Sequence, residues 1–256
     1  MQASAAVVTG AGGGVGRAVA AALAAKGVPV AVADSDPATL AVTADKLAAD
    51  GARVLPVPTD VRSPAQARAL IDAAEEHLGP VAQLVNAAGV LHVGEACRLS
   101  DAQWEECIAV NATGVFAVSR AAAERMVPRR SGSIVTIASN AAGTARTGMG
   151  AYAASKAAAA MFTKCLGLEL AERGIRCNVV APGSTDTPML RSMWSSDADR
   201  RATLDGSPGA YRVGIPLRRV ASPDDVAAAA LFLLSDAAAH ITMHTLTVDG
   251  GATLGV

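Results

Sequence analysis

The residues that most constrain the fold lie near the N-terminus, where a short apolar run passes directly into a glycine-rich turn. Residues 5–9 (A-A-V-V-T) predict a buried strand, residues 10–16 (G-A-G-G-G-V-G) follow without a linker, and residues 17–26 predict a helix. A strand, a glycine turn and a helix in this order are typical of a βαβ unit that binds a dinucleotide. The sequence therefore predicts a nucleotide-binding α/β fold.

The glycines of this turn have distinct expected tasks. Gly10 would allow the tight turn, Gly14 would let the backbone approach a pyrophosphate, and Gly16 would let the helix pack closely on the strand. Gly12 and Val15 complete the predicted cofactor loop. Unpaired N–H groups at the start of the helix would bind the phosphates.

The next predicted strand, residues 28–33, ends at Asp34. An acidic side chain at this place accepts hydrogen bonds from the hydroxyls of an adenosine ribose and repels a 2′-phosphate. Because no arginine or lysine adjoins Asp34 in the sequence, we expect NAD rather than NADP as the cofactor.

Helix and strand signals alternate along the rest of the chain. Helix starts are indicated at Asp36, Ser63 and Ser100, and Ser100 forms a capping box with Gln103. Further apolar strands are predicted at residues 53–57, 81–85, 133–138, 175–180 and 245–248. We therefore expect one doubly wound Rossmann domain spanning residues 1–256, with a seven-stranded parallel sheet and helices on both faces.

Composition excludes several other classes of function. The chain has 51% hydrophobic and only 3% aromatic residues, and a net charge of −1 from interspersed charges, so we expect no nucleic-acid partner. The apolar start lacks a basic leader, and the longest apolar run, residues 226–234, is about half a membrane span, so we expect a cytoplasmic protein without a membrane partner.

Cysteine and histidine spacing does not indicate a metal site. Four cysteines form no C-x-x-C pair, and we expect reduced, mostly buried thiols. His240 and His244 are four residues apart, but no acidic residue completes a zinc-binding pattern, so we expect no metal.

The strongest catalytic signal is Tyr152-Ala-Ala-Ser-Lys156 at the start of an alanine-rich segment. On a helix this spacing places the phenol and the ammonium on one face, about one turn apart. A neighbouring cation favours the phenolate, so we expect Lys156 to lower the pKa of Tyr152 toward neutrality. Ser139 ends the apolar strand upstream and could hold the same substrate oxygen.

Other informative residues also follow predicted strands, where ligands bind in parallel sheets. They are Asp60 after the third strand, Asn86-Ala87-Ala88-Gly89 after the fourth, and Pro182-Gly183 after the sixth. Residues 186–215 are irregular and rich in Ser, Asp, Arg and Gly, and we expect them to form a mobile lid over the substrate.

Together, Thr9-Gly10-x-x-x-Gly14-x-Gly16, Asn86-Ala-Ala-Gly89, Asn111, Ser139, Tyr152-x-x-x-Lys156 and Pro182-Gly183 with Thr187 resemble the short-chain dehydrogenase/reductase family over the whole chain. The resemblance implies that Tyr152 is the acid/base, that Lys156 also binds the nicotinamide ribose, and that Ser139 orients the reacting oxygen. It further implies that Asn111 holds the water of a proton relay. Asp60 and Val61 would flank the adenine, and the remaining implied cofactor contacts are Asn86, Ala87, Gly89, Pro182, Gly183, Thr185 and Thr187.

Longer segments, such as N-A-A-G-V-L-H-V-G and R-C-N-V-V-A-P-G-S-T-D-T, are similar to the members of this family that act on dihydroxycyclohexadiene carboxylic acids. That resemblance implies NAD-dependent oxidation of a ring hydroxyl to an aromatic product, as in the biosynthesis of catechol siderophores, by a homotetramer. Three alternatives stay open: an enzyme for the amino analogue trans-2,3-dihydro-3-hydroxyanthranilate, a 3-oxoacyl carrier-protein reductase, and a dinucleotide sensor that has lost catalysis.

A cyclic hydroxy carboxylic acid as substrate requires a partner for its carboxylate. Arg146, between Ser139 and Tyr152, could bind the carboxylate with two parallel hydrogen bonds, and Arg191 in the lid is a second candidate. Asn140 could face a ring hydroxyl or an amine. We expect the remaining pocket walls to include His92, Met149 and Met189.

Overall fold

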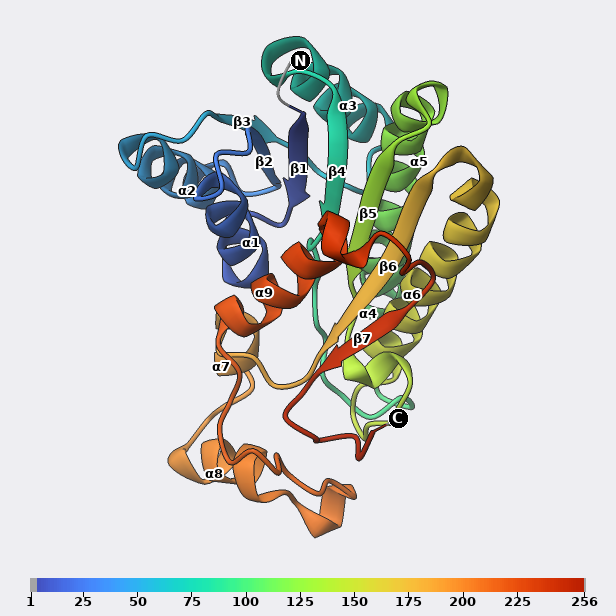
Figure 1. Cartoon of the computed structure of the whole chain (residues 1–256). Helices are drawn as coiled ribbons and strands as arrows, with labels where there is room; N and C mark the ends of the chain where they lie inside the picture. The colour runs from blue at the N-terminus through green and yellow to red at the C-terminus, as the bar shows by residue number, and fades with distance from the viewer. Residues whose placement is uncertain (1–3, 256) are drawn as a thin grey trace.

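The computed structural model describes residues 4–255 as a parallel sheet with helices on both faces (Figure 1). The sheet has seven strands in the order β3-β2-β1-β4-β5-β6-β7, and every neighbouring pair is parallel. The strands are β1 Ala5–Thr9, β2 Val30–Asp34, β3 Val54–Pro58, β4 Val81–Asn86, β5 Gly132–Ile137, β6 Ile175–Pro182 and β7 Thr245–Val248. The predicted fold class is confirmed.

Helices cover the two faces in separate groups (Figure 1). On one face lie α1 Gly14–Ala24, α2 Pro37–Ala49 and α9 Pro223–Leu234, and on the other lie α3 Pro64–Leu78, α4 Asp101–Ile108, α5 Gly114–Met126 and α6 Gly150–Leu170. Successive side chains of a strand point to opposite faces. Ala5 and Val7 of β1 therefore pack under α3 and α5, while Ala6 and Val8 pack under α1 and α9, and all of β1 is buried.

The helix starts follow the capping signals in the sequence. The side chains of Asp36, Ser63 and Ser222 each accept a hydrogen bond from a backbone N–H of the first turn, and proline opens each of these helices. Ser100 and Gln103 form the predicted capping box. The exception is α1, which begins at Gly14 rather than at residue 17, because Val15 and Gly16 at the end of the loop already belong to its first turn.

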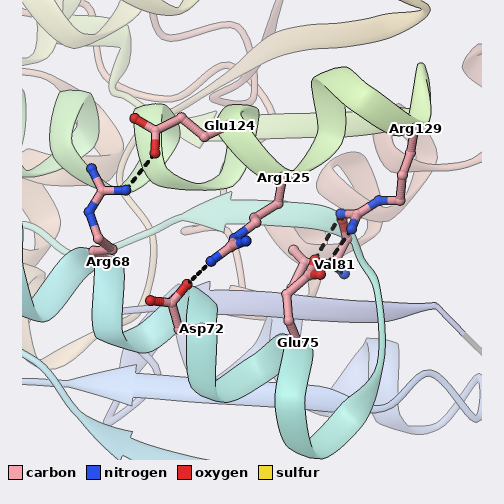
Figure 2. Close-up of polar contacts among 7 residues, drawn as sticks. All are labelled: Arg68, Asp72, Glu75, Val81, Glu124, Arg125 and Arg129. Atoms are coloured by element: carbon pink, nitrogen blue, oxygen red, sulfur yellow. Dashed lines mark hydrogen bonds and ion pairs between the residues drawn. The ribbon is translucent and has the colours of Figure 1, made fainter.

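Figure 2 shows three ion pairs between α3 and the chain that runs from α5 into the following turn, namely Arg68–Glu124 at 2.6 Å, Asp72–Arg125 at 2.5 Å and Glu75–Arg129 at 2.8 Å. Exposed pairs of this kind contribute only about 0–1 kcal/mol each. Apolar burial thus holds α3 and α5 on the sheet, and the ion pairs add little to it.

Between β6 and α9 the chain leaves the sheet and crosses its carboxyl edge (Figure 1, orange). This segment holds α7 Pro188–Arg191, α8 Asp197–Asp205 and a 3₁₀ turn at Pro208–Ala210. A short π-helix at Ala109–Thr113 joins α4 to α5, and short 3₁₀-helices lie at Val127–Arg129, Asn140–Ala142, Ala171–Arg173 and Asp236–Ala238. Within residues 4–255, no helix is both long and apolar enough to cross a bilayer.

The cysteines differ from expectation in one respect. Cys107 and Cys177 are buried, but Cys97 and Cys165 are exposed, so the expectation of mostly buried thiols is wrong for half of them. Cys165 lies on the long helix α6, whose outer face is not covered by another element, and helical periodicity alone does not tell which face is covered.

Candidate active site

A large cavity of about 710 Å³ lies at the carboxyl ends of the strands, next to the point where the strand order reverses between β1 and β4. Most of the predicted site residues line this cavity: Gly10, Gly14, Val15, Gly16, Asp34, Asp60, Val61, Ala87, Gly89, Ser139, Asn140, Arg146, Met149, Tyr152, Lys156, Pro182, Gly183, Thr185, Thr187 and Met189. Gly12, Asn86, His92, Asn111 and Arg191 do not line it.

The glycine loop fits a pyrophosphate. Gly10 has a φ of +67°, and a Cβ there would lie 2.6–2.7 Å from the backbone of Ala87 and Ala88. A Cβ on Gly16 would collide with the carbonyl oxygen of Gly10. Helix α1 starts after Gly13 with no side-chain cap, so its first N–H groups are left for a ligand.

Arg17 supports this loop, a role that the sequence did not reveal. Its guanidinium donates to the carbonyl oxygen of Gly12, and its Nε donates to Thr43 Oγ1 at 2.9 Å. Thr43 Oγ1 donates in turn to the carbonyl oxygen of Ala11 at 3.0 Å. The loop is thereby fixed to α2 before any cofactor binds.

Asp34 lies where an adenosine ribose would meet the loop. Its Oδ2 accepts a hydrogen bond from the N–H of Gly12 at 2.8 Å, and its Oδ1 accepts one from the N–H of Asp36 at 3.0 Å. These bonds hold the carboxylate at the cavity wall, where its charge would repel a 2′-phosphate. The site therefore fits NAD better than NADP.

We expect Asp34→Ser to lower the ratio of kcat/KM with NAD to kcat/KM with NADP on the order of 100-fold, because close like charges cost several kcal/mol. Asp36→Ser is the matched control, since Asp36 is exposed, caps α2 and lies outside the cavity. Steady-state kinetics with both dinucleotides measure the ratio. An unchanged ratio in Asp34→Ser would assign the cofactor preference to other residues.

Asp60 and Val61 form the wall beyond Asp34. Arg62 donates to both carboxylate oxygens of Asp60, at 2.7–3.0 Å, and this hydrogen bonding holds the pKa of Asp60 below its usual value. Val61 packs against Gly114, where a Cβ would lie 2.6 Å from the valine side chain. Arg62 also lines the cavity and was not predicted.

The catalytic candidates come together at the start of α6 and the end of β5. Ser139 lies two residues after the end of β5, and its hydroxyl forms a hydrogen bond with the phenol of Tyr152. Lys156 lies one turn after Tyr152, with its Nζ 5.9 Å from the centroid of the Tyr152 ring. That Nζ donates to the carbonyl oxygen of Ile137 at 2.9 Å.

The ionisation of this group differs from the sequence-based expectation. Burial raises the pKa of Tyr152, and the hydrogen bond from Ser139 lowers it by less. Burial also lowers the pKa of Lys156 to about 8. Because desolvation opposes both charged forms, Lys156 alone does not bring the Tyr152 pKa toward neutrality, and the expectation that it would is wrong for the protein without cofactor.

We expect Ser139→Ala to move the ascending limb of the pH–rate profile for oxidation to higher pH. Tyr152 must lose its proton before it can accept one from an alcohol, and the Ser139 hydrogen bond lowers the pKa of that phenol. A profile of kcat/KM against pH for both forms measures the shift. A limb that stays in place, or moves to lower pH, would contradict the role of Ser139 in setting the Tyr152 pKa.

Asn111 and Asn86 are buried behind the cavity wall. Asn111 Oδ1 accepts from the N–H of Val90 at 2.8 Å, and its Nδ2 donates to the carbonyl oxygen of Val90 and to Ser155 Oγ, both at 2.9 Å. Asn86 Nδ2 donates to Ser119 Oγ at 2.9 Å. The side-chain amide of Asn111 already joins the loop after β4 to α6. A relay water at Asn111 would therefore bond to the main chain of this residue.

Two predicted substrate contacts point elsewhere. Arg191 forms an exposed ion pair with Asp186 at 2.7 Å, and His92 Nε2 lies 2.7 Å from Glu106 Oε2. Arg191 and Asp186 both lie outside the cavity. His92 also lies outside it, although its partner Glu106 lines it, so the structure brings neither predicted side chain into the cavity. Arg146 does line the cavity, half-buried, near Ser139 and Tyr152.

Arg212 also lines the cavity and was missed by sequence analysis. It lies 60 positions beyond Tyr152 in an irregular segment, with no motif around it. The fold of the chain after α8, and no local motif, places Arg212 at the wall of the same cavity as Arg146. Met193 and Trp194, from the same segment, complete this side of the cavity.

A strand-end dinucleotide cradle next to a Ser–Tyr–Lys group defines a class of nicotinamide-dependent oxidoreductases. The chain belongs to the short chain dehydrogenase family, whose model matches residues 4–198, and it is an oxidoreductase that uses NAD.

Within this family, the chain is similar to several individual proteins. The chain is 51% identical over 98% of its length to the 2,3-dihydro-2,3-dihydroxybenzoate dehydrogenase of Bacillus subtilis (strain 168), of which it covers 96%. It is 41% identical over 97% of its length to the enzyme of the same name from Escherichia coli (strain K12), of which it covers 96%. A crystal structure of a short-chain type dehydrogenase/reductase from Mycobacterium marinum superimposes with a TM-score of 0.88 at 33% identity, covering 98% of this chain and 95% of that one.

Proposed function

We propose that the enzyme oxidises a ring hydroxyl of 2,3-dihydro-2,3-dihydroxybenzoate with NAD and gives 2,3-dihydroxybenzoate. The observation that carries this proposal is the position of Arg146, a half-buried guanidinium without an ion-pair partner among residues 4–255, in the same cavity as Tyr152 and Ser139. A cation at that place suits a substrate with a carboxylate next to the reacting alcohol. The two relatives that bear this name, at 51% and 41% identity, support the same substrate.

The residues divide the work as follows. Ser139 holds the ring hydroxyl beside Tyr152, and the Tyr152 phenolate takes the hydroxyl proton while a hydride leaves the same carbon. When bound against the glycine loop, Asp34 and Lys156, NAD would supply the hydride acceptor and a positive ring that would favour the phenolate form of Tyr152. Loss of one proton and one hydride turns the alcohol carbon into a ketone, which tautomerises to the aromatic ring.

The experiment that tests this function follows NADH absorbance with three candidate substrates: 2,3-dihydro-2,3-dihydroxybenzoate, its amino analogue trans-2,3-dihydro-3-hydroxyanthranilate, and a 3-hydroxyacyl carrier protein. We expect the dihydroxy acid to give the highest kcat/KM. Asn140 Nδ2 donates a hydrogen bond to Asp249 Oδ2 at 3.2 Å, and this bond fixes the orientation of the Asn140 side-chain amide. A higher kcat/KM for the amino analogue or the carrier protein would refute the proposed substrate.

Three further features belong to the same proposal. Residues 186–215 act as a lid of the single domain formed by residues 1–256. The enzyme assembles as a homotetramer, which light scattering tests as a mass four times the 25.6 kDa of one chain. It works in the cytoplasm, for which four free cysteines are suited.

A further inference from the structure

Arg212 is held in place by a small hairpin within the segment 186–215. Ser207 and Arg212 exchange two backbone hydrogen bonds, at 2.8 and 3.0 Å. At the base of the hairpin the backbones of Gly206 and Gly214 approach each other closely, with φ values of +91° and +83°. A Cβ on Gly206 would lie 2.5 Å from the carbonyl oxygen of Arg212. Residues 206–214 therefore carry Arg212 as a unit.

The carboxylates around Arg212 and Arg146 are used elsewhere. Asp249, whose charge reaches Arg146, accepts hydrogen bonds from Asn140 Nδ2, Thr253 Oγ1 and the N–H of Gly251. Asp199 accepts from the N–H of Ser195 and from Ser196 Oγ at the start of α8. Among residues 4–255, neither Arg146 nor Arg212 forms an ion pair.

Other arginines of this region have acidic partners. Arg191 pairs with Asp186 at 2.7 Å, and Arg218 pairs with Asp205 at 2.6 Å, both on the outer surface. Arg146 and Arg212 instead both line the cavity, on segments that meet only in the fold. Both guanidiniums line one cavity, and burial and the charge of Arg212 both lower the pKa of Arg146, as expected for two like charges in the same cavity. An anion between them would remove the repulsion between these charges.

We propose that Arg212 is a second carboxylate-binding residue, which holds the acid group of the substrate together with Arg146 and thereby draws the 206–214 hairpin onto the bound ring. The inference rests on the proposed function, since it takes the substrate to be an acid. Arg146 lies in the loop between β5 and α6, and Arg212 lies in the segment 186–215, which crosses the carboxyl edge of the sheet. One carboxylate, with two oxygens and several acceptor positions, can serve two guanidiniums. Binding of the acid then couples substrate recognition to closure over the site.

Kinetics with a matched pair of substrates test the binding role. The enzyme and its Arg212→Gln, Arg146→Gln and double variants are assayed with 2,3-dihydro-2,3-dihydroxybenzoate and with 3,5-cyclohexadiene-1,2-diol, which lacks the carboxylate. We expect Arg212→Gln to lose about 10- to 100-fold in kcat/KM for the acid, mainly through KM, and little for the diol. Arg212→Lys should recover part of the loss, because it keeps the charge without the fork.

The double variant and a control sharpen this test. Because one anion is shared, the losses from Arg146→Gln and Arg212→Gln should not multiply in the double variant. Arg201→Gln removes the same charge from the exposed side of α8, outside the cavity, and should leave both substrates unaffected. Equal losses for the acid and the diol in Arg212→Gln, or no loss for either, would overturn the proposal.

Trp194 gives an independent readout of closure. It lies in the segment 186–215, lines the cavity and donates from Nε1 to Thr203 Oγ1 at 3.0 Å. The chain has only one other tryptophan, the exposed Trp104 on α4, so Trp104→Phe leaves Trp194 as the sole emitter. We expect benzoate to change Trp194 emission saturably in the NAD-loaded Trp104→Phe protein, and neutral benzamide to have no such effect.

Adding Arg212→Gln to the Trp104→Phe protein should abolish the benzoate response. A response that persists, or one that benzamide reproduces, would overturn the coupling of Arg212 to the anion. The two proposals fail in different ways. A native enzyme that does not oxidise the dihydroxy acid refutes the proposed function, whereas a native enzyme that oxidises it, with Arg212→Gln unaffected, refutes only the role of Arg212.

Discussion

Tyr152→Phe is expected to lower kcat roughly 10³-fold or more and to leave the dissociation constant of NAD nearly unchanged. The phenol forms a hydrogen bond with Ser139 and lines the same cavity as Arg146, and its loss removes the acceptor of the alcohol proton. The ring remains, so the cavity keeps its shape. Stopped-flow or steady-state oxidation gives kcat, and titration calorimetry gives the NAD affinity.

A matched control exists for this substitution, because the chain has only one other tyrosine. Tyr211 is 88% exposed and lies outside the cavity, so Tyr211→Phe removes the same hydroxyl without reaching the site. We expect native turnover from it. Oxidation at the native rate by Tyr152→Phe would show that another group removes the proton and would end the mechanism described above.

Lys156→Met is expected to abolish activity and, at pH 7, to make the cofactor-free protein more stable. Lys156 is buried, and burial lowers its pKa from 10.5 to about 8. Below pH 8 the folded protein therefore contains a buried ammonium, which lowers the free energy of unfolding. Methionine fills similar volume without a charge. After subtracting the lost hydrogen bond to Ile137, we expect a gain of roughly 1–2 kcal/mol in the free energy of unfolding.

The pH dependence of this gain has a definite sign. Between pH 8 and 10.5 the unfolded chain keeps a proton on Lys156 that the folded chain has lost, so the native enzyme becomes more stable as pH rises through this window. The advantage of Lys156→Met should therefore shrink from pH 8 toward pH 10. Urea unfolding at several pH values measures it, with Lys164→Met on the same helix as the control.

Lys164 is only partly buried, and its replacement should change stability by no more than about 0.5 kcal/mol at any pH. If Lys156→Met were less stable than the native protein at pH 7, the buried ammonium would not carry the expected cost. Such a result would point to a contact of Lys156, beyond the Ile137 carbonyl, that compensates for its burial.

The sequence by itself determined the sheet, the cofactor loop and the identity of the catalytic candidates. These features depend on local patterns. Short apolar runs define the strands, and capping residues define the helix starts. Gly10 and Gly16 are required because a Cβ at either position would collide with backbone, and Tyr152 and Lys156 are neighbours on one helix wherever that helix lies. The order of motifs along the chain was enough to place them at one edge of a parallel sheet.

Only the tertiary structure decided what surrounds these residues. The pKa of Tyr152 depends on burial by segments distant in sequence, so a helical spacing predicts a neighbour but not the desolvation that outweighs it. Arg191 and Arg212 stand in the same irregular segment and look alike in the sequence. The fold gives Arg191 an exposed carboxylate partner and places Arg212 at the cavity wall. Gly206 and Gly214 close the hairpin locally, but its place in the fold depends on distant contacts, such as the hydrogen bond from the N–H of Leu217 to the carbonyl oxygen of Gly250.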